Sequence, residues 1–439
     1  MALAGPVVIS QLGHTLVQTA DTMIVGHFAG KISLAAVSLT HSVFMIVLVI
    51  GLGIAYGLTP LIAQANGKSN KDECAKLLSN SFWLNALAGV LLFCLVYFGS
   101  MFAMQHADQD PEVVETAKPY LLLLSLSIFP LMIFNTFKQF AEGLGFTKQA
   151  MQITIWGNVL NVILAIILVK GMLGFEPMGI RGVGIATFID RILMMFAMMF
   201  YVLKSKHFKP YIEKFSFFSI QWSRLKEILR IGTPVAMQYV FEIGAFAGAS
   251  LIAGKIGALE QASHQVAITL AAMTYMMASG IAAAATIKVG NNFGNRKFHK
   301  LQKFATASYH LVLVFMIFTA IIFAVFNQYL PLLISKDHEV VVLAAQLLII
   351  AGLFQLFDGT QVVGLGVLRG MGDVNIPTLI TFFAYWIIGL PSGYFMGINL
   401  NMGVQGIWYG LTLGLLTSSI LLYFRYRYII NRKLLVTYN

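Results

Sequence analysis

The chain has 439 residues, of which 58% are hydrophobic and only 11% are charged. A water-soluble protein needs far more surface charge, so this composition excludes the soluble classes and indicates a polytopic membrane protein. The net charge of +11 does not indicate nucleic-acid binding, because in a membrane protein excess Lys and Arg mostly mark cytoplasmic loops. Cys74 and Cys94 are the two cysteines, too few for a disulfide framework or a cysteine metal cluster.

Twelve apolar stretches are each long enough to cross a bilayer, which takes about 20 helical residues. We expect transmembrane helices at 3–26, 34–64, 77–104, 117–137, 150–169, 180–203, 229–253, 258–288, 304–326, 340–367, 376–397 and 403–424. Several exceed the bilayer thickness, which predicts tilt or extension beyond it. The first has no basic segment before it and continues past Asp21, so no cleavable signal peptide is expected; a short native segment is expected to precede it.

The loops between these stretches differ strongly in charge when taken alternately. One set holds most of the Lys and Arg residues, Lys138 and Arg369 among them, whereas the other includes the acidic segment 108–115. By the positive-inside rule, the basic set is cytoplasmic. The sequence therefore predicts a protein of the inner (plasma) membrane with both termini in the cytoplasm.

The two halves of the sequence echo each other. Pro6 and Pro234 are 228 residues apart, and Glu142-Gly143-Leu144-Gly145 resembles Arg369-Gly370-Met371-Gly372 at an offset of 227. This indicates a duplication into two pseudo-symmetric six-helix bundles, an N-lobe at 1–203 and a C-lobe at 229–439, joined by a cytoplasmic linker at 204–228. Such parallel repeats are typical of carriers. No Walker A, GxSxG or HExxH motif is present, so we expect neither an enzyme nor a cofactor beyond a coupling ion.

Four carboxylates lie within the apolar stretches, whereas the other acidic residues are assigned to loops. They are Asp21, Asp190, Glu242 and Asp358, and Glu242 lies near the middle of the apolar run Ile231–Gly254. Each costs about 2.5–3.5 kcal/mol on insertion scales and is a functional candidate by default. Arg191 is the main basic residue expected inside the membrane. The excess of carboxylates over basic residues inside the membrane indicates that the protein binds protons, metal cations or a cationic substrate.

Asp21 ends a polar stripe on one face of the first helix, formed with Gln11, His14 and Gln18. The stripe either takes part in ion or proton coupling, which is favoured for Asp21, or makes hydrogen bonds between helices. Pro6 either lets this helix bend or produces a static kink, because proline removes a backbone donor.

The other two central carboxylates have amide neighbours on their own helices. Gln238 precedes Glu242 by one turn, and Gln355 and Gln361 flank Asp358. Oxygen ligands of this kind suit hard cations such as Na⁺, and buried carboxyls equally suit protons. The sequence does not distinguish Na⁺ from H⁺ as the bound ion. It also leaves open a structural role for Glu242, as a protonated side chain that only hydrogen-bonds a neighbouring helix.

Several further residues have two interpretations. Asp190 is either a structural partner of a basic residue or part of a site; Asn158 and Asn161 are ligands or contacts between helices; and His264 is a packing residue or a proton relay. Methionines of the eighth helix could line a cavity for flat organic cations, namely Met273, Met276 and Met277.

The sequence resembles the multidrug and toxic compound extrusion (MATE) transporters, in particular the NorM-like branch, along essentially the whole chain. The motifs that carry the resemblance are ADTMIVGHFAG at 20–30, AQANG at 63–67, PVAMQYVFEIGAF at 234–246, ASHQVAITLAAMTYM at 262–276, LFQLFDGTQVVGLGVLRGMGD at 353–373 and IPTLITFFAYWIIGLP at 376–391. The resemblance implies two six-helix lobes in a V around a central cavity. It also implies export of organic cations and drugs in exchange for Na⁺ or H⁺.

Residue by residue, the resemblance implies cation or proton coupling at Asp21 in the N-lobe and cation binding, with Na⁺ possible, at Glu242 and Asp358 in the C-lobe. The chain departs from the family pattern twice. Asn161 matches a fifth-helix ligand, but Ala165 occupies the position of the aspartate expected four residues later, and Phe354 occupies the position of a tenth-helix tyrosine. The departure at Ala165 shifts the expected ion site toward the C-lobe carboxylates, whereas the departure at Phe354 removes one expected ligand beside Asp358.

We therefore expect a secondary antiporter that works by alternating access. Its expected partners are small organic cations or drugs and membrane lipid, with no nucleic acid, and its expected oligomeric state is a monomer. One alternative is an exporter of a lipid-linked or anionic substrate on the same fold, which would require a basic cavity. Another is a membrane scaffold or receptor that transports nothing, which has no reason to keep unneutralised carboxylates.

Overall fold

The structure is a computed structural model that describes residues 3–106 and 111–438, and every regular element in these ranges is helical. Within the same ranges, 11 helical runs are long and apolar enough to cross a membrane. Each coincides with one predicted stretch, and the remaining prediction, 3–26, coincides with α1 (Ala4–Phe28). The predicted all-helical, multi-pass membrane architecture is confirmed.

The chain divides into two compact units. The N-terminal unit is Ile9–Ala236, and the C-terminal unit combines Met1–Val8 with Met237–Asn439. Both boundaries fall inside helices, α1 and α10 (Trp222–Ile256), so the segment 204–228 belongs to the N-terminal unit. Val8 and Ala236 are 228 residues apart, which is the offset of the sequence repeat.

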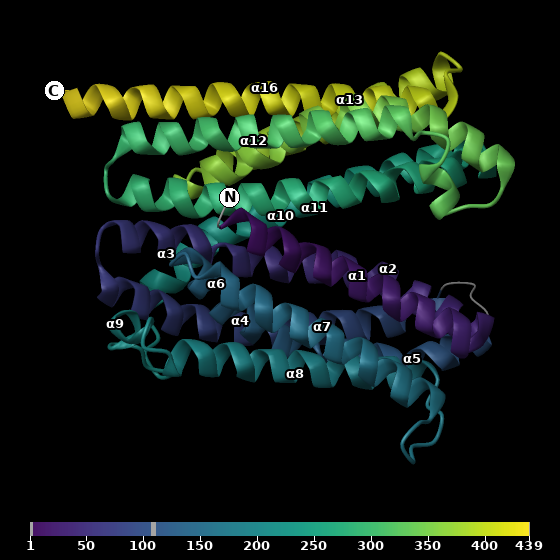
Figure 1. The fold of residues 1–439 in the computed structure, drawn as a ribbon, viewed down its shortest axis with the longest axis horizontal. Coiled ribbons are helices and arrows are strands. Elements are labelled where there is room, and N and C mark those ends of the chain that lie inside the picture. Colours follow the sequence, from purple (N-terminus) through teal and green to yellow (C-terminus); the bar gives the residue numbers. More distant parts are fainter. Residues whose placement is uncertain (1–2, 107–110, 439) are drawn as a thin grey trace. The chain divides into compact units, whose positions relative to one another are not determined.

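The N-terminal unit packs its long helices side by side. After α1 come α2 (Gly30–Tyr56), α3 (Leu58–Gly67), α4 (Lys71–His106), α5 (Pro111–Leu126), α6 (Ile128–Gly143), α7 (Thr147–Lys170), α8 (Ile180–Lys204) and the short α9 (Lys209–Ile212). The pairs α7 with α8 and α4 with α6 run alongside each other (Figure 1). Single-residue breaks at Gly57 and Ser127 divide two of the spans into α2 with α3 and α5 with α6.

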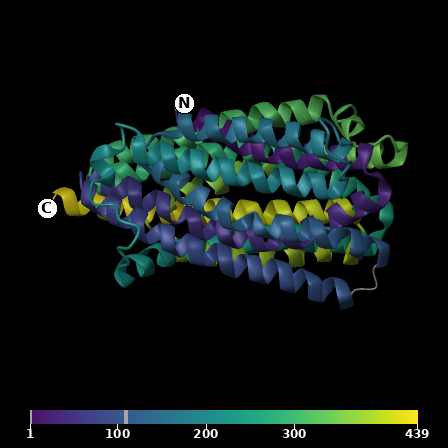
Figure 2. The ribbon, with the colours of Figure 1, turned by 90° about the horizontal axis from the view of Figure 1, so that it is seen from below.

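The C-terminal unit is built in the same way. It contains most of α10, then α11 (Ala258–Gly294), α12 (Phe298–Val325), the 3₁₀ turn η1 (Leu330–Leu333), α13 (His338–Gly370), α14 (Asn375–Phe382), the π-helical segment η2 (Phe383–Gly389), α15 (Leu390–Tyr394), the π-helical segment η3 (Phe395–Asn399) and α16 (Gly403–Tyr438). α13 packs against α11, α12 and α16. These helices keep a common direction in the second view (Figure 2). The central position of α13 explains why its residues from Phe354 onward are nearly all buried.

Close backbone contacts occur where α1 and α10 approach the unit boundaries. A Cβ added to Gly53 of α2 would lie 2.3 Å from the Cα of Ala236. In the C-terminal unit, a Cβ added to Gly280 of α11 would lie 2.8 Å from the Cα of Val8. The two contacts are related by the sequence repeat, and both depend on glycine because only a residue without a side chain permits this approach.

The predicted linker is attached to the N-terminal half of α4. Arg224 Nη2 lies 2.8 Å from Glu73 Oε2, and the backbone N–H of Gln221 donates to Asn80 Oδ1 at 2.6 Å. Lys214 forms an ion pair with Asp72. The segment is therefore a folded part of its unit.

Candidate cation sites in the membrane-spanning helices

Glu242 of α10 and Asp358 of α13 lie in one buried cluster of the C-terminal unit. Their exposed fractions are 5% and 3%, and the two carboxylates are close enough to interact electrostatically. The phenol of Tyr275, on α11, donates a hydrogen bond to Glu242. Three helices therefore converge on a pair of carboxylates that the sequence placed on separate helices.

The amide residues predicted beside Asp358 are part of the same cluster. Gln355 and Gln361 are both fully buried. Tyr385 OH donates to Gln361 Oε1 at 2.9 Å. Within the part of the chain that the structure describes, Asp358 Oδ1, Gln355 Oε1 and Gln361 Nε2 have no hydrogen-bond partner. Buried polar atoms without partners are costly. Asp358 Oδ1 and Gln355 Oε1 are oxygens that can ligate a small cation, whereas Gln361 Nε2 is a hydrogen-bond donor and cannot.

Two phenols of this site were missed by the sequence analysis, Tyr275 and Tyr385. The missing tenth-helix tyrosine, replaced by Phe354, led us to expect one ligand fewer, whereas Tyr275 and Tyr385 both interact with Glu242. Tyr385 lies in the π-helical segment η2, and π-helical turns frequently occur at functional sites. The π-helical turn is visible only in the structure, so no local signal in the sequence distinguished Tyr385.

Gln238 lies one turn before Glu242, as predicted, but its partners are on other helices. Its Nε2 donates to Thr378 Oγ1 at 3.0 Å, and its Oε1 accepts from Arg369 Nη2 at 3.3 Å. Arg369 was assigned to a cytoplasmic loop, and the structure corrects this: it lies within α13, half-buried, and acts electrostatically on Glu242. The predicted stretch ended at residue 367, because the next charged residue, Arg369, was taken as the start of a loop.

Asp21 lies in a second buried cluster, in the N-terminal unit. Asp190 and Arg191, consecutive on α8, are close enough to interact electrostatically with it. Arg191 Nη1 donates to Ser127 Oγ at 2.6 Å, at the break between α5 and α6. Asp190 therefore belongs to the cluster around Asp21, and Arg191 is a member as well.

Asn158 and Asn161 of α7 are both buried in this unit, as the sequence pattern suggested. Asn161 Nδ2 donates to Thr187 Oγ1 on α8 at 3.2 Å. The buried atoms without a hydrogen-bond partner among the described residues include one on each of these four side chains, namely Asp21 Oδ1, Asp190 Oδ1, Asn158 Nδ2 and Asn161 Oδ1. The side chains of Gln18 and His14, predicted in the same stripe, lie outside the described part of the structure.

Lys138 and Glu142 of α6 form a third buried group that the sequence analysis assigned wrongly to loops. Both side chains are about as buried as the carboxylates above, with 4% exposed in each residue, and they lie within a membrane span. Lys138 Nζ is 4.0 Å from Glu142 Oε1 and donates to Ser10 Oγ at 3.0 Å. The expectation that Arg191 is the main internal cation is therefore wrong.

The remaining candidates are dispersed. His264 is buried against Trp408, with ring centroids 5.7 Å apart, in the apolar core of the C-terminal unit. Met273 is 49% exposed, and Met277 is half-buried. No contact of these residues joins them to the carboxylates in the described part of the chain.

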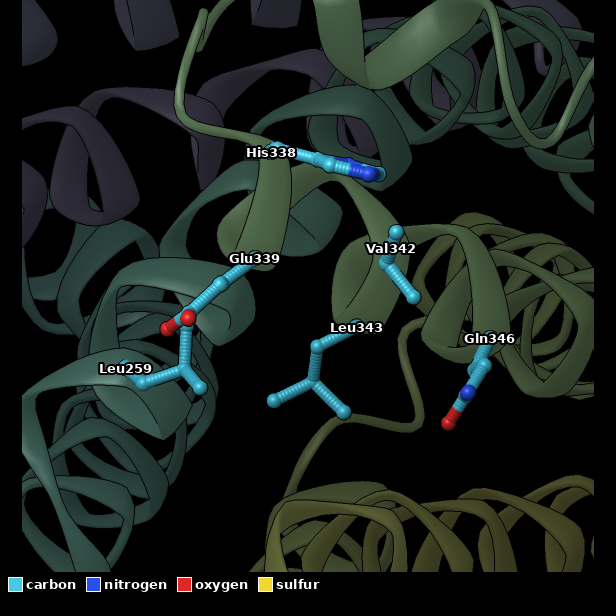
Figure 3. A pocket seen from close by; sticks show the side chains of 6 residues that line it. All are labelled: Leu259, His338, Glu339, Val342, Leu343 and Gln346. Carbon is cyan, nitrogen blue, oxygen red and sulfur yellow. The ribbon is translucent and has the colours of Figure 1, made fainter.

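A cavity of about 330 Å³ lies at the end of α11 and α13 that the charge pattern predicts to face outward (Figure 3). It is lined by Leu259, His338, Glu339, Val342, Leu343 and Gln346. It contains none of the predicted site residues.

Comparisons with known proteins agree with this architecture. Residues 6–167 and 234–395 each match the MatE family, two segments related by the repeat offset of 228 residues. The chain is 32% identical over 433 residues to the "Multidrug resistance protein MdtK" of Yersinia enterocolitica, covering 98% of this chain and 94% of that protein. The MdtK of Yersinia pestis gives the same identity and coverage.

Solved structures share the fold. A MATE crystal structure in the bent conformation has a TM-score of 0.92 at 22% sequence identity, covering 100% of this chain and 96% of that one. The eukaryotic MATE transporter AtDTX14 has a TM-score of 0.88 at 20% identity, covering 98% and 96%. With the family match over both halves and a relative above 30% identity, the chain belongs to the MatE family of membrane transporters.

Proposed function

We propose that this protein is a secondary active multidrug efflux antiporter that exports organic cations in exchange for Na⁺ or H⁺. The observation that supports this most is the burial of Glu242 and Asp358 in one site, where Asp358 keeps an oxygen without a hydrogen-bond partner among the described residues. Carboxylates are expensive inside a membrane and are maintained there for ion or proton binding. The proposed coupling groups are Glu242 and Asp358 in the C-terminal unit and Asp21 in the N-terminal unit.

The proposed substrate class follows from charge and from relatives. The curated relatives above are named multidrug resistance proteins, and a site rich in carboxylates attracts cations. The rival reading, a lipid-linked or anionic substrate, needs a basic site. Carboxyl groups outnumber the guanidinium group in each cluster, two to one, with Asp21 and Asp190 beside Arg191 and with Glu242 and Asp358 near Arg369, so organic cations fit better.

In the proposed cycle, the coupling cation enters from outside and binds Glu242 and Asp358 in one conformation more tightly than in the other. This differential affinity drives the conformational change, because a ligand with equal affinity for both states shifts nothing. Drug release accompanies cation binding because both compete for the same negative charge. We further propose that the protein lies in the inner (plasma) membrane, that both of its termini are in the cytoplasm, and that it is a monomer.

The test is efflux of a fluorescent organic cation from proteoliposomes under an imposed Na⁺ gradient and, separately, under a pH gradient. We expect one gradient to drive efflux and Glu242→Gln and Asp358→Asn each to abolish it while the protein still inserts and purifies. Drive by Na⁺ alone would assign coupling to Glu242 and Asp358, and drive by protons alone would favour Asp21. If neither gradient moves the cation, the antiporter proposal is wrong and the anionic-substrate rival gains support.

A further inference from the structure

The segment 216–222, which leads from α9 into α10, exposes a row of large apolar side chains. Phe218, Ile220 and Trp222 are 89%, 57% and 66% exposed, whereas the residues that alternate with them are less exposed. We call these three side chains the apolar row. Exposed apolar groups that lie together with basic residues around them mark an interaction surface.

The backbone of the apolar row is fixed to α4. The indole N–H of Trp83 donates to the backbone carbonyl of Phe217, and the backbone N–H of Gln221 donates to Asn80 Oδ1 at 2.6 Å. The ring of Phe217 also packs against that of Phe82, with centroids 5.1 Å apart. These contacts hold the segment from its less exposed side and leave the apolar row uncovered.

The apolar row is continuous with the side of α4 that faces lipid. Large exposed apolar side chains recur along α4 at three- and four-residue intervals, which places them on one face of the helix. They are Trp83, Leu87, Val90, Leu91, Leu95 and Phe98. Because α4 is long and apolar enough to span the membrane, this face contacts hydrocarbon. Its first member, Trp83, binds Phe217, and tryptophan is enriched where hydrocarbon meets the headgroups.

The surroundings of the apolar row are basic. The segment 204–228 carries six Lys and Arg residues and two Glu residues, and two of the basic residues form ion pairs with α4. Lys206, Lys209 and Lys226 are exposed, and none of them belongs to an ion pair of the described residues. Lys226 Nζ lies 5.4 Å from the ring centroid of Trp222, so an ammonium group borders the apolar row.

We propose that the apolar row and Lys206, Lys209 and Lys226 form a binding surface for anionic phospholipids of the cytoplasmic leaflet. The apolar row inserts among the headgroups, and the ammonium groups bind lipid phosphates, because an anionic leaflet attracts basic segments beside the membrane. A soluble acidic partner would account for the lysines but not for the continuity with the lipid-facing side of α4. The proposal rests on the cytoplasmic orientation given under the proposed function.

The experiment uses the purified full chain in detergent and measures lipid binding by native mass spectrometry. The probe is dioleoyl phosphatidylglycerol, and dioleoyl phosphatidylcholine, with the same acyl chains, is the neutral reference. We expect phosphatidylglycerol to bind more tightly. Each of Lys206→Gln, Lys209→Gln and Lys226→Gln should weaken its binding about fivefold, since a basic residue beside an anionic leaflet contributes about 1 kcal/mol and 1.4 kcal/mol is tenfold.

The contribution of the apolar row is tested separately. Phe218→Ser combined with Trp222→Ser should weaken the binding of both lipids, because contacts of the apolar row do not depend on headgroup charge. Lipid affinities equal to those of the unaltered protein would overturn the insertion of the apolar row.

The matched control for the lysines removes three charges from another basic part of the chain. Lys297→Gln, Lys300→Gln and Lys303→Gln, at the start of α12, should each leave phosphatidylglycerol binding unchanged, although these lysines are also exposed. An equal loss in these variants overturns the proposal, because any exposed lysine would then suffice. So does equal binding of the two lipids by the unaltered protein, or unchanged binding in the variants of segment 204–228.

If the variants do not fold, the unaltered protein still decides. Phosphatidylglycerol should slow chymotrypsin cleavage after Phe218 several-fold relative to phosphatidylcholine, because bound lipid covers the apolar row. Equal cleavage rates overturn the proposal. Glycerol phosphate at the same concentration should have no effect, and slowing as strong as that by phosphatidylglycerol would assign the surface to a soluble phosphate compound instead of a lipid.

The outcome is separable from that of the proposed function. Lipid binding is measured without an ion gradient or a drug, so a protein that shows no cation-driven efflux can still support the proposal. Efflux that persists in a protein with no preference for phosphatidylglycerol would support antiport and overturn the lipid surface. Chymotrypsin cleavage after Phe218 from outside right-side-out vesicles would overturn the assignment to the cytoplasmic leaflet.

Discussion

Lys138 Nζ lies 3.0 Å from Ser10 Oγ, so a buried ammonium on α6 holds α1. The C-terminal unit repeats this relationship, because Arg369 of α13 donates to Gln238 of α10. Ser10 and Gln238 are 228 residues apart, and each is the second residue after the point where its helix passes from one unit to the other. A basic residue therefore fixes the leading helix of each repeat at the same place.

Lys138→Met should strongly destabilise the protein, because it leaves Glu142 buried without its cation. Breaking a buried pair from one side costs about 3–5 kcal/mol, and the melting temperature in detergent measures the loss. Lys138→Met combined with Glu142→Gln removes both charges and should recover most of the stability. A double variant as unstable as the single one would show that the pair's charge is not what matters.

Gly53→Ala should destabilise the N-terminal unit by about 1–3 kcal/mol, the usual cost of overpacking. The added methyl would meet the backbone of Ala236, which cannot rotate away as a flexible side chain would. Gly99→Ala is the control, since nothing lies within 4 Å of a Cβ at that position of α4. There the helix should gain about 0.5–1 kcal/mol, and equal melting temperatures for the two variants would contradict the close contact.

Hydropathy was sufficient to predict the 11 spans found among the described residues, the helix α1, and the positions of Asp21, Glu242 and Asp358 within these helices, because both signals are local in the sequence. The pairing of Glu242 with Asp358 was not predictable from spacing, since 116 residues separate them. The same holds for Tyr385, one of 16 tyrosines in the chain, which nothing local distinguishes.

Lys138, Glu142 and Arg369 were misassigned for a physical reason. Each lies near the C-terminal end of its helix, past the end of the predicted apolar stretch, because a stretch that is ended at the first charged residue leaves such residues in the loops. The spacing of Lys138 and Glu142, four residues apart among apolar neighbours, was the signal that could have revealed a buried pair.

Tyr385→Phe should cost about 1–3 kcal/mol, because a buried hydrogen-bond acceptor, Gln361 Oε1, loses its donor. The opposite end of the same amide, Nε2, already lacks a partner among the described residues. Thermal unfolding in detergent, with and without Na⁺, measures the effect. Tyr394→Phe is a suitable control, since Tyr394 is 43% exposed, and an equal loss in both variants would contradict the specific role of Tyr385.

Arg224→Ala should release the segment 204–228 from α4. Arg224 joins Glu73 at 2.8 Å and Glu227 at 3.1 Å, with only 30% of its side chain exposed, so it connects this segment to α4 through a partly buried network. Chymotrypsin cleavage near Phe217 and Phe218 should accelerate several-fold, because local opening exposes the backbone to the protease.

Lys214→Ala is the matched comparison for that experiment. The ion pair of Lys214 with Asp72 is more than half exposed on both sides, with 60% and 51% of the side chains accessible, and exposed pairs contribute little because solvent screens them. Its cleavage rate should stay close to that of the unaltered protein. Equal acceleration in both variants would mean that the partly buried ion pair holds the segment no better than the exposed one, and that the hydrogen bond from Gln221 to Asn80 holds it instead.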